Sequence, residues 1–268
     1  MPKGRHRKGV AREGFYMNIV IPSFGRSDHL KGADYFKSAI YIVPESQRDQ
    51  YAKKVQGKRV IAIPEDQDGC ITRKRNWILK NIERPLIMID DDVQRIGYFE
   101  GRRGLKNGSH KPKSMDPELL SAFFNHSFEV ADQFGSRMWG LNQNEDNRTY
   151  KEFLPFSLSA ISLGPFQGHL EHDLFFDKRV GTKDDYDMAL QQLQKYKILF
   201  RWNKYHYICE HGVNAGGIVS YRKKEKEIEY CRAIMKKWGR SIIKYELPPK
   251  KMTDLLNAKF VKIPISGV

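Results

Sequence analysis

Short apolar runs, most of them closed by proline, alternate with polar segments through the first third of the chain. Each run suits a buried strand, and the intervening segments 45–55 and 71–81 have helical character. Strands that alternate with helices predict a parallel sheet covered by helices on both faces, and therefore an α/β fold. The predicted strands span residues 17–22, 39–43, 60–63 and 86–89.

The remainder of the chain is less regular, and residues 157–169 fit no single element. A loop rich in glycine and basic residues is predicted at 101–113, because this stretch lacks hydrophobic periodicity. Pro117 is well placed at the first position of a helix that ends near residue 135. Further strands are predicted at 93–99, 137–141 and 205–209, and further helices at 183–196 and 223–237.

The 268 residues carry a formal net charge of +15, an excess that an enzyme for small neutral substrates does not need. Nucleic acid as partner would explain this charge, because neutralised phosphates release counterions; a solvated basic surface is the alternative. No apolar run is long enough to span a bilayer, so no membrane partner is expected. Three scattered cysteines suit a reducing compartment and predict a cytoplasmic protein.

Three consecutive carboxylates, Asp90, Asp91 and Asp92, follow the fourth predicted strand. Ligands of parallel sheets bind beyond the carboxyl ends of the strands. Adjacent carboxylates repel one another, and a hard divalent cation such as Mg²⁺ or Mn²⁺ would offset that cost. An exposed acidic turn is the alternative. The cationic helix start at 69–76 suits a phosphate group and favours the metal interpretation.

The order of these segments resembles the nucleotide-binding half of GT-A glycosyltransferases. The resemblance rests on IPSFGR at 21–26, IVPE at 42–45, GCITRKRN at 69–76 and LIMIDDD at 86–92. It continues through Phe175-Phe176-Asp177 and through GTKDDYDM at 181–188, which looks like the acidic acceptor-side motif of that family. More narrowly, the small basic chain is similar to the phage TET-associated glycosyltransferases, which modify 5-hydroxymethylpyrimidines in DNA.

The resemblance implies a single Rossmann-like GT-A domain over residues 17–268. The basic residues at 1–16 predict a disordered or loosely docked arm before it. The nucleotide-sugar-binding half would span 17–100, and the acceptor-side half 101–222. Residues 223–268 would form a C-terminal helical extension. A phage protein of this kind would act in the host cytoplasm.

On the donor side, the resemblance assigns Asp92 as the direct ligand of Mn²⁺ or Mg²⁺. Asp90 would contact the ribose or a metal-bound water, and Asp91 could serve in either way. Many GT-A enzymes complete the metal shell with a late histidine, for which His211 is the candidate and His206 the runner-up. The nucleotide, usually UDP, and the donor sugar would be held by Pro22, Ser23, Arg26, Arg73 and Arg75.

On the acceptor side, sugar transfer requires a carboxylate that takes the proton of the acceptor hydroxyl. In inverting members of the family this base is the last acid of the acceptor motif, which points to Asp185. Asp184 stands where a glutamate is usual, so either member of the pair could act. Capping of the helix that starts here is the alternative role.

Basic and aromatic residues are the candidates for the acceptor surface. Rings interleaved with cations at 201–205 could stack on a nucleobase, although the tryptophan there could equally belong to the core. The candidates for DNA contact are Arg102, Arg103, Lys106, Trp202 and Lys204.

Together these features predict a metal-dependent, inverting glycosyltransferase that moves a sugar from a nucleotide-sugar to the hydroxyl of a 5-hydroxymethylpyrimidine in DNA. One alternative is a GT-A glycosyltransferase for polysaccharide, lipid or protein, with the charge incidental. Another is a non-catalytic DNA-binding module that retains the transferase fold. A nucleotidyltransferase is a third, because it too uses acids at strand ends.

Overall fold

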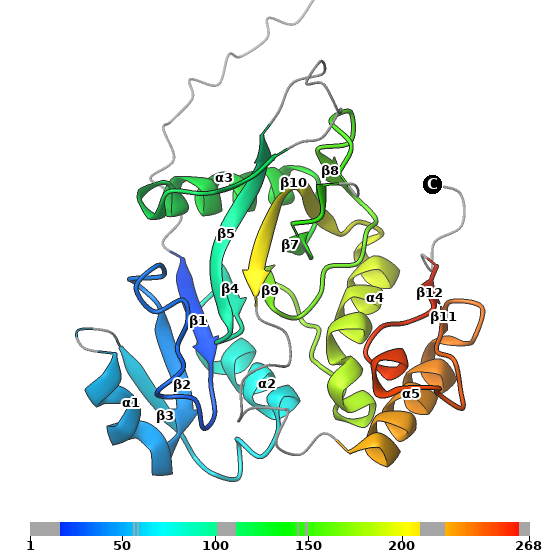
Figure 1. Cartoon of the computed structure of the whole chain (residues 1–268), viewed down its shortest axis with the longest axis horizontal. Coiled ribbons are helices and arrows are strands. Elements are labelled where there is room, and N and C mark those ends of the chain that lie inside the picture. Colours follow the sequence, from blue (N-terminus) through cyan, green and yellow to red (C-terminus); the bar gives the residue numbers. More distant parts are fainter. Residues whose placement is uncertain are drawn as a thin grey trace, which may run out of the picture.

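The computed structural model describes residues 17–55, 57, 59–100, 111–143, 145–147, 150–209 and 223–262, arranged around one 10-stranded sheet (Figure 1). The first four strands are β1 (Asn18–Pro22), β2 (Ile40–Pro44), β3 (Val60–Ile63) and β4 (Leu86–Ile89). They are parallel and lie in the order β3-β2-β1-β4. Their carboxyl ends therefore meet at one edge of the sheet, where residues 90–92 emerge.

The second half of the sheet is mixed. β9 (Phe166–His169) is antiparallel to β4, and β7 (Met138–Asn142) is antiparallel to β9. β10 (Phe200–Cys209) runs parallel to β7 and antiparallel to β5 (Val93–Glu100). The short strands β6 (Lys111–Ser114) and β8 (Phe156–Ser157) pair with β5 and β10. Because Cys209 is paired with Val93, β10 ends beside the acidic turn.

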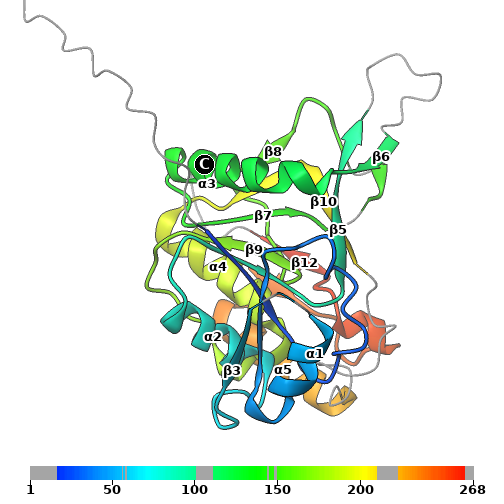
Figure 2. The same ribbon diagram turned by 90° about the vertical axis from the view of Figure 1, so that its left-hand side faces the viewer.

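Helices lie on both faces of the sheet (Figure 2), and alternate residues of the strands belong to two different apolar clusters. Ile19 and Ile21 of β1 belong to an apolar cluster with α1 (Arg48–Lys54) and the aromatic face of α3 (Leu120–Gln133). Val20, between them, belongs to a second cluster with α2 (Ile71–Asn81) and α4 (Asp184–Tyr196). Burial on both faces explains why these strands are apolar throughout instead of alternating with polar residues.

Residues 223–262 pack on the outer side of α4 (Figure 1). They comprise α5 (Lys224–Trp238), the 3-10 turn η6 (Met252–Leu255), and a two-stranded sheet of β11 (Ile243–Lys244) and β12 (Phe260–Val261). Ile234 and Leu255 of this part form a third apolar cluster with Tyr186 and Leu190 of α4. The helix that begins with the acceptor motif is therefore covered from both sides.

The predicted α/β fold is confirmed, with local differences. The segment predicted as one helix at 45–55 is a 3-10 turn, η1 (Glu45–Gln47), followed by α1. The helix predicted from Pro117 likewise begins with a 3-10 turn, η2 (Pro117–Leu119), which the Asp116 carboxylate caps by accepting from the Glu118 amide. Residues 111–113, predicted as loop, belong to the edge strand β6. The strand predicted at 205–209 begins earlier, at Phe200.

The segment that fitted no single element contains part of β8 and all of β9. The predicted arm at 1–16 lies outside the described residues. In the part of the chain that the structure describes, no helix is both long and apolar enough to cross a membrane.

Candidate active site

The acidic triplet forms a turn at the end of β4. The Asp90 amide donates to the carbonyl of Pro165 at 3.0 Å, and the Val93 amide donates to the carbonyl of Asp90 at 3.1 Å. Asp91 is buried, whereas Asp90 and Asp92 are half-buried. The turn gives each of these three neighbouring carboxylates a different nearest partner.

Asp91 points back to the loop after β1. Its carboxylate accepts hydrogen bonds from the Ser23 hydroxyl and, at 2.5 Å, from the Arg26 guanidinium. The hydroxyls of Ser23 and Tyr51 lie 2.6 Å apart, and all four side chains are buried. The predicted donor-binding residues Ser23 and Arg26 therefore contact Asp91 of the triplet, but both side chains are buried. Pro22, also predicted, is the buried last residue of β1.

Among the described residues, the nearest hydrogen-bond donor to Asp92 is uncharged. Its carboxylate accepts from the thiol of Cys209 at 3.3 Å, and it lies 3.9 Å from the Arg26 guanidinium. Burial, followed by the charges of Asp90 and Asp91, raises the pKa of Asp92 to about 7. The ionised form of this carboxyl gains from a nearby cation, so its surroundings fit the predicted role of metal ligand.

Arg75 joins the triplet to the second acidic motif. Its guanidinium lies 3.0 Å from the Asp90 carboxylate and 2.9 Å from that of Asp184. Asp184 also accepts from the Thr72 hydroxyl at 3.1 Å. Burial raises the pKa of Asp184 to about 6, although Arg75 acts in the opposite direction. The structure therefore brings the predicted donor-side and acceptor-side acids together around one buried arginine.

The periodicity of α2 explains why adjacent residues of its cationic start have different surroundings. Residues three or four positions apart share one face of a helix. Thr72, Arg75 and Asn76 face the acceptor side, where the Asn76 amide group donates to and accepts from the backbone of Phe176, both at 2.8 Å. Arg73 is exposed and donates to a backbone carbonyl in the loop before α2 at 3.3 Å. Of the two predicted arginines in α2, only Arg75 contacts the acidic residues.

Two residues that lie close together in space, Phe24 in the loop after β1 and Lys74 in α2, were not among the predicted donor-binding residues. Lys74 is buried, lies 3.1 Å from Asp68, and donates to the carbonyl of Ser23. Its ammonium group is 5.8 Å from the centre of the Phe24 ring. Phe24 is 39% exposed and offers a ring face on which a base could stack. The sequence signal was a large aromatic residue inside a turn, where small or polar residues are usual.

Asp185 is less buried than Asp184 and is oriented by backbone groups. Its two carboxylate oxygens accept from the amides of Gly164, at 3.1 Å, and Tyr186, at 2.7 Å. A Cβ at Gly164 would lie 2.9 Å from the Arg75 guanidinium and 3.3 Å from the Asp185 Cβ. Glycine therefore allows the close approach of these groups. Partial exposure suits a carboxylate that must reach an acceptor hydroxyl.

Several predicted site residues lie outside the described part of the chain, and these are His211, Arg102, Arg103 and Lys106. The runner-up His206 is buried in β10, with its ring centre 4.6 Å from that of Phe99. Burial lowers the pKa of His206 to about 4. This histidine belongs to the core of the sheet.

Trp202 and Lys204 lie on β10, far from the acidic turn. Trp202 precedes the end of the strand by seven residues, a separation of about 23 Å along an extended chain. Its ring centre is 4.9 Å from that of Phe200, and its indole nitrogen donates to Ser127 of α3 at 2.9 Å. This placement favours the core interpretation over base stacking at the site. The Lys204 ammonium lies 5.9 Å from the ring centre of Tyr205.

Among the described residues, no three His, Cys, Asp or Glu side chains are arranged to hold a metal ion. Asp92 and Asp90 offer oxygen ligands, which hard cations prefer. Mg²⁺ commonly uses one or two protein carboxylates, and water and substrate phosphates complete its coordination. The residues present fit a cation shared with a bound diphosphate.

The family model described as TET-Associated Glycosyltransferase matches residues 17–217. No curated protein matches the chain. The chain is similar to S. aureus TarS 1-349 in complex with UDP-GlcNAc, with a TM-score of 0.47, 11% identity, and coverage of 82% of this chain and 67% of that chain. It is similar to S. aureus TarS 1-349 with a TM-score of 0.45, 10% identity, and coverage of 72% and 60%. For S. aureus TarS the TM-score is 0.41, with 12% identity and coverage of 82% of this chain but only 40% of that chain.

Proposed function

Because the chain belongs to the TET-associated glycosyltransferase family, we propose that it transfers a sugar from a nucleotide-sugar to the hydroxyl of a 5-hydroxymethylpyrimidine in DNA. Membership of the family shows that the chain is a glycosyltransferase. The identities of its donor, metal ion and acceptor are what we propose here. The observation that carries it is the meeting of two acidic motifs on either side of Arg75. The net charge of +15 supports a polyanionic acceptor.

On the donor side, Asp92, with Asp90 beside it, would hold Mn²⁺ or Mg²⁺. When bound, the cation stabilises the negative charge that develops on the leaving nucleoside diphosphate. The contacts of Asp91 with Ser23 and Arg26 hold the loop after β1 against this turn. The exposed ring of Phe24, in the same loop, offers a stacking surface to the base of the donor.

On the acceptor side, Asp185 is the general base. The acceptor hydroxyl oxygen forms a bond to the anomeric carbon, and the bond from that carbon to the diphosphate oxygen breaks. The electron pair leaves with the nucleoside diphosphate, and the hydroxyl proton passes to Asp185. A single displacement of this kind inverts the configuration at the anomeric carbon. Asp184, bound by Arg75 and Thr72, supports this arrangement from within the protein.

A donor screen tests the proposal. The protein is incubated with Mn²⁺, a series of nucleotide-sugars, and DNA that contains 5-hydroxymethylcytosine, and the nucleosides are then analysed by mass spectrometry. We expect a sugar mass on the modified base, release of a nucleoside diphosphate, and no product on unmodified DNA. Transfer to a polysaccharide, lipid or protein acceptor, with none to DNA, would overturn the proposed acceptor. Release of pyrophosphate would indicate nucleotidyl transfer instead.

A further inference from the structure

Residues that follow the part of the chain matched by the family model contact the segment around Asp184 and Asp185. The match ends at residue 217, whereas α5 and the elements after it occupy residues 223–262. The acidic pair begins α4 and is preceded by the 3-10 segment η4 (Lys178–Lys183). A buried charged residue just before the pair, Lys183, and another just after it, Asp187, each form an ion pair with a residue of α5.

The first contact lies directly before the pair. The side chains of Lys183 and its partner Glu227, from α5, are each only 1% exposed, and they lie 2.8 Å apart. Lys183 also donates to the carbonyl of Leu255 at 2.6 Å. The Thr182 hydroxyl is 2.8 and 2.9 Å from the two carboxylate oxygens of Glu227. Separating such a pair would leave a buried charge without compensation, so the contact resists displacement.

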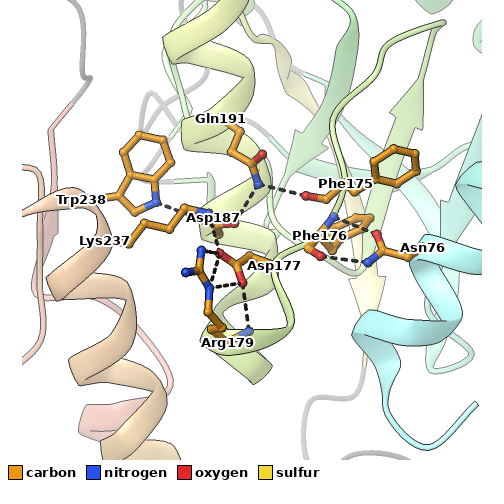
Figure 3. Close-up of polar contacts among 9 residues, drawn as sticks. All are labelled: Asn76, Phe175, Phe176, Asp177, Arg179, Asp187, Gln191, Lys237 and Trp238. Carbon is orange, nitrogen blue, oxygen red and sulfur yellow. Dashed lines mark hydrogen bonds and ion pairs between the residues drawn. The ribbon is translucent and has the colours of Figure 1, made fainter.

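The second contact follows the pair by two residues, at the fully buried Asp187 (Figure 3). Its carboxylate accepts from Trp238 Nε1 at 2.7 Å and lies 2.7 and 2.8 Å from Lys237 Nζ. Gln191 of α4 donates to the same carboxylate at 2.8 Å. Lys237 also lies 3.0 Å from Asp177, the residue before η4. One lysine of α5 therefore joins the two ends of the segment that surrounds the acidic pair.

The backbone between these contacts is also held closely. Gly181 of η4 has a φ of 50°, a left-handed conformation that favours glycine. A Cβ at this position would lie only 2.4 Å from the ring of Tyr230 in α5. The chain of η4 thus lies directly against α5, immediately before Asp184.

We propose that residues 223–262 form a clamp that positions the Asp184–Asp185 pair, with Glu227, Lys237 and Trp238 as its positioning residues. This inference rests on the proposed function, because Asp185 is a base only in that mechanism. α2 holds the pair from the inner side, and the clamp holds it from the outer side. Misplacement of a reacting group by about 1 Å can lower a rate about 100-fold, so loosening the outer side should affect turnover.

Two lysines that follow one another in α5 provide a matched test. Lys237→Met removes the contacts with Asp187 and Asp177, whereas Lys236→Met removes the same charge from the adjacent residue, which is also exposed. We expect Lys237→Met to lower kcat about 10- to 100-fold, with the KM for the nucleotide-sugar within about twofold of wild type. Lys236→Met should leave both constants unchanged. A kcat for Lys237→Met within about twofold of that for Lys236→Met would overturn the clamp.

A second pair of variants repeats the comparison at the other contact. Glu227→Gln weakens the buried pair with Lys183, and its control is Glu229→Gln, which changes an exposed pair with Lys226. If Lys237→Met fails to fold, Trp238→Phe replaces it, because phenylalanine keeps an aromatic ring and loses only the N–H donor. We expect Glu227→Gln and Trp238→Phe to lower kcat and to leave the KM for the nucleotide-sugar unchanged. Glu229→Gln should change neither constant.

Backbone hydrogen exchange separates this inference from the proposed function. In Lys237→Met and Trp238→Phe, we expect faster exchange at residues 184–190 and unchanged exchange in β1 to β4. That result supports the clamp even if the wild-type protein transfers no sugar to DNA, in which case only the proposed function fails. Unchanged exchange at 184–190, or an equal loss of protection throughout the chain, would show that the C-terminal part does not position the pair.

Discussion

The two acidic regions of the site consist of the same kind of side chain but are neutralised differently. In the acceptor motif, the buried carboxylates of Asp184 and Asp187 lie 2.9 Å from Arg75 and 2.7 Å from Lys237. At the end of β4, by contrast, Asp92 has a thiol at 3.3 Å and a guanidinium at 3.9 Å. Asp90 and Asp91 are also paired with arginines, at 3.0 and 2.5 Å. The difference between the regions therefore lies at Asp92, where the proposed metal ion would supply the missing positive charge.

The difference has a physical cause. A buried carboxylate is stable in its ionised form only if a cation or several hydrogen bonds replace the lost hydration. The acceptor motif has such partners on both sides, which favours a fixed geometry for a base. Among the described residues, Asp92 lies beside two other carboxylates and accepts from one thiol, and burial together with those charges raises its pKa to about 7.

The strongest test of the comparison removes the proposed base. We expect Asp185→Asn to lower kcat about 10²- to 10⁴-fold, because the acceptor hydroxyl loses its proton acceptor, while nucleotide binding is retained. Steady-state kinetics on hydroxymethylated DNA measure this, and Asp173→Asn, at a carboxylate that is 71% exposed, serves as control. A larger loss for Asp184→Asn than for Asp185→Asn would assign the base to the other member of the pair.

The second test breaks the link between the regions. Arg75→Met leaves the buried carboxylate of Asp184 and the half-buried carboxylate of Asp90 without their cation. We expect the free energy of unfolding to fall by about 3–5 kcal/mol. Arg73→Met, two positions away on the exposed side of α2, should change it by less than about 0.5 kcal/mol. Urea unfolding at pH 7 measures both variants. Equal losses for the two arginines would contradict the assignment of Arg75 as the shared counter-ion.

The third test concerns pH. The pKa of Asp92 is raised from 3.8 to about 7, so in the metal-free protein this carboxyl holds a proton below pH 7. A cation must displace that proton, and we expect Mn²⁺ affinity to weaken about tenfold per unit as the pH falls below 7, and to level off above it. Calorimetric titration between pH 5.5 and 8.5 measures the trend, and Asp92→Asn should abolish it. Affinity that is independent of pH would place the metal elsewhere.

The same shift has a consequence for stability. A carboxyl whose pKa is higher in the folded protein than in the unfolded chain stabilises the fold at low pH, and this contribution is lost as the pH rises towards 7. We therefore expect the metal-free protein to gain stability from Asp92 as the pH falls from 7 towards 4, and Asp92→Asn to remove this gain. Thermal unfolding of both proteins across that range measures it. Saturating Mn²⁺ should stabilise the wild type most at high pH.

The first half of the fold was predictable because its strands are buried on both faces and bounded by proline. The second half was less so, because β9 is a short strand with the sequence FQGH, which shows neither apolar continuity nor alternation. Its place depends on pairing with β4 and β7, which are far away in the sequence. Trp202 was equally ambiguous, since an aromatic residue beside cations is compatible with a core position and with a binding surface.

By itself, the sequence determined the alternation of strands and helices, and it determined that the acids follow β4 and begin α4. These features depend on local periodicity, which neighbouring residues establish. Only the tertiary structure decided which cation each acid meets. Arg73 and Arg75 are chemically identical, yet the rotation of α2 exposes one and turns the other towards Asp184, 109 residues away. Lys237 reaches Asp187 across 50 residues in the same way, because helix packing and not chain proximity brings them together.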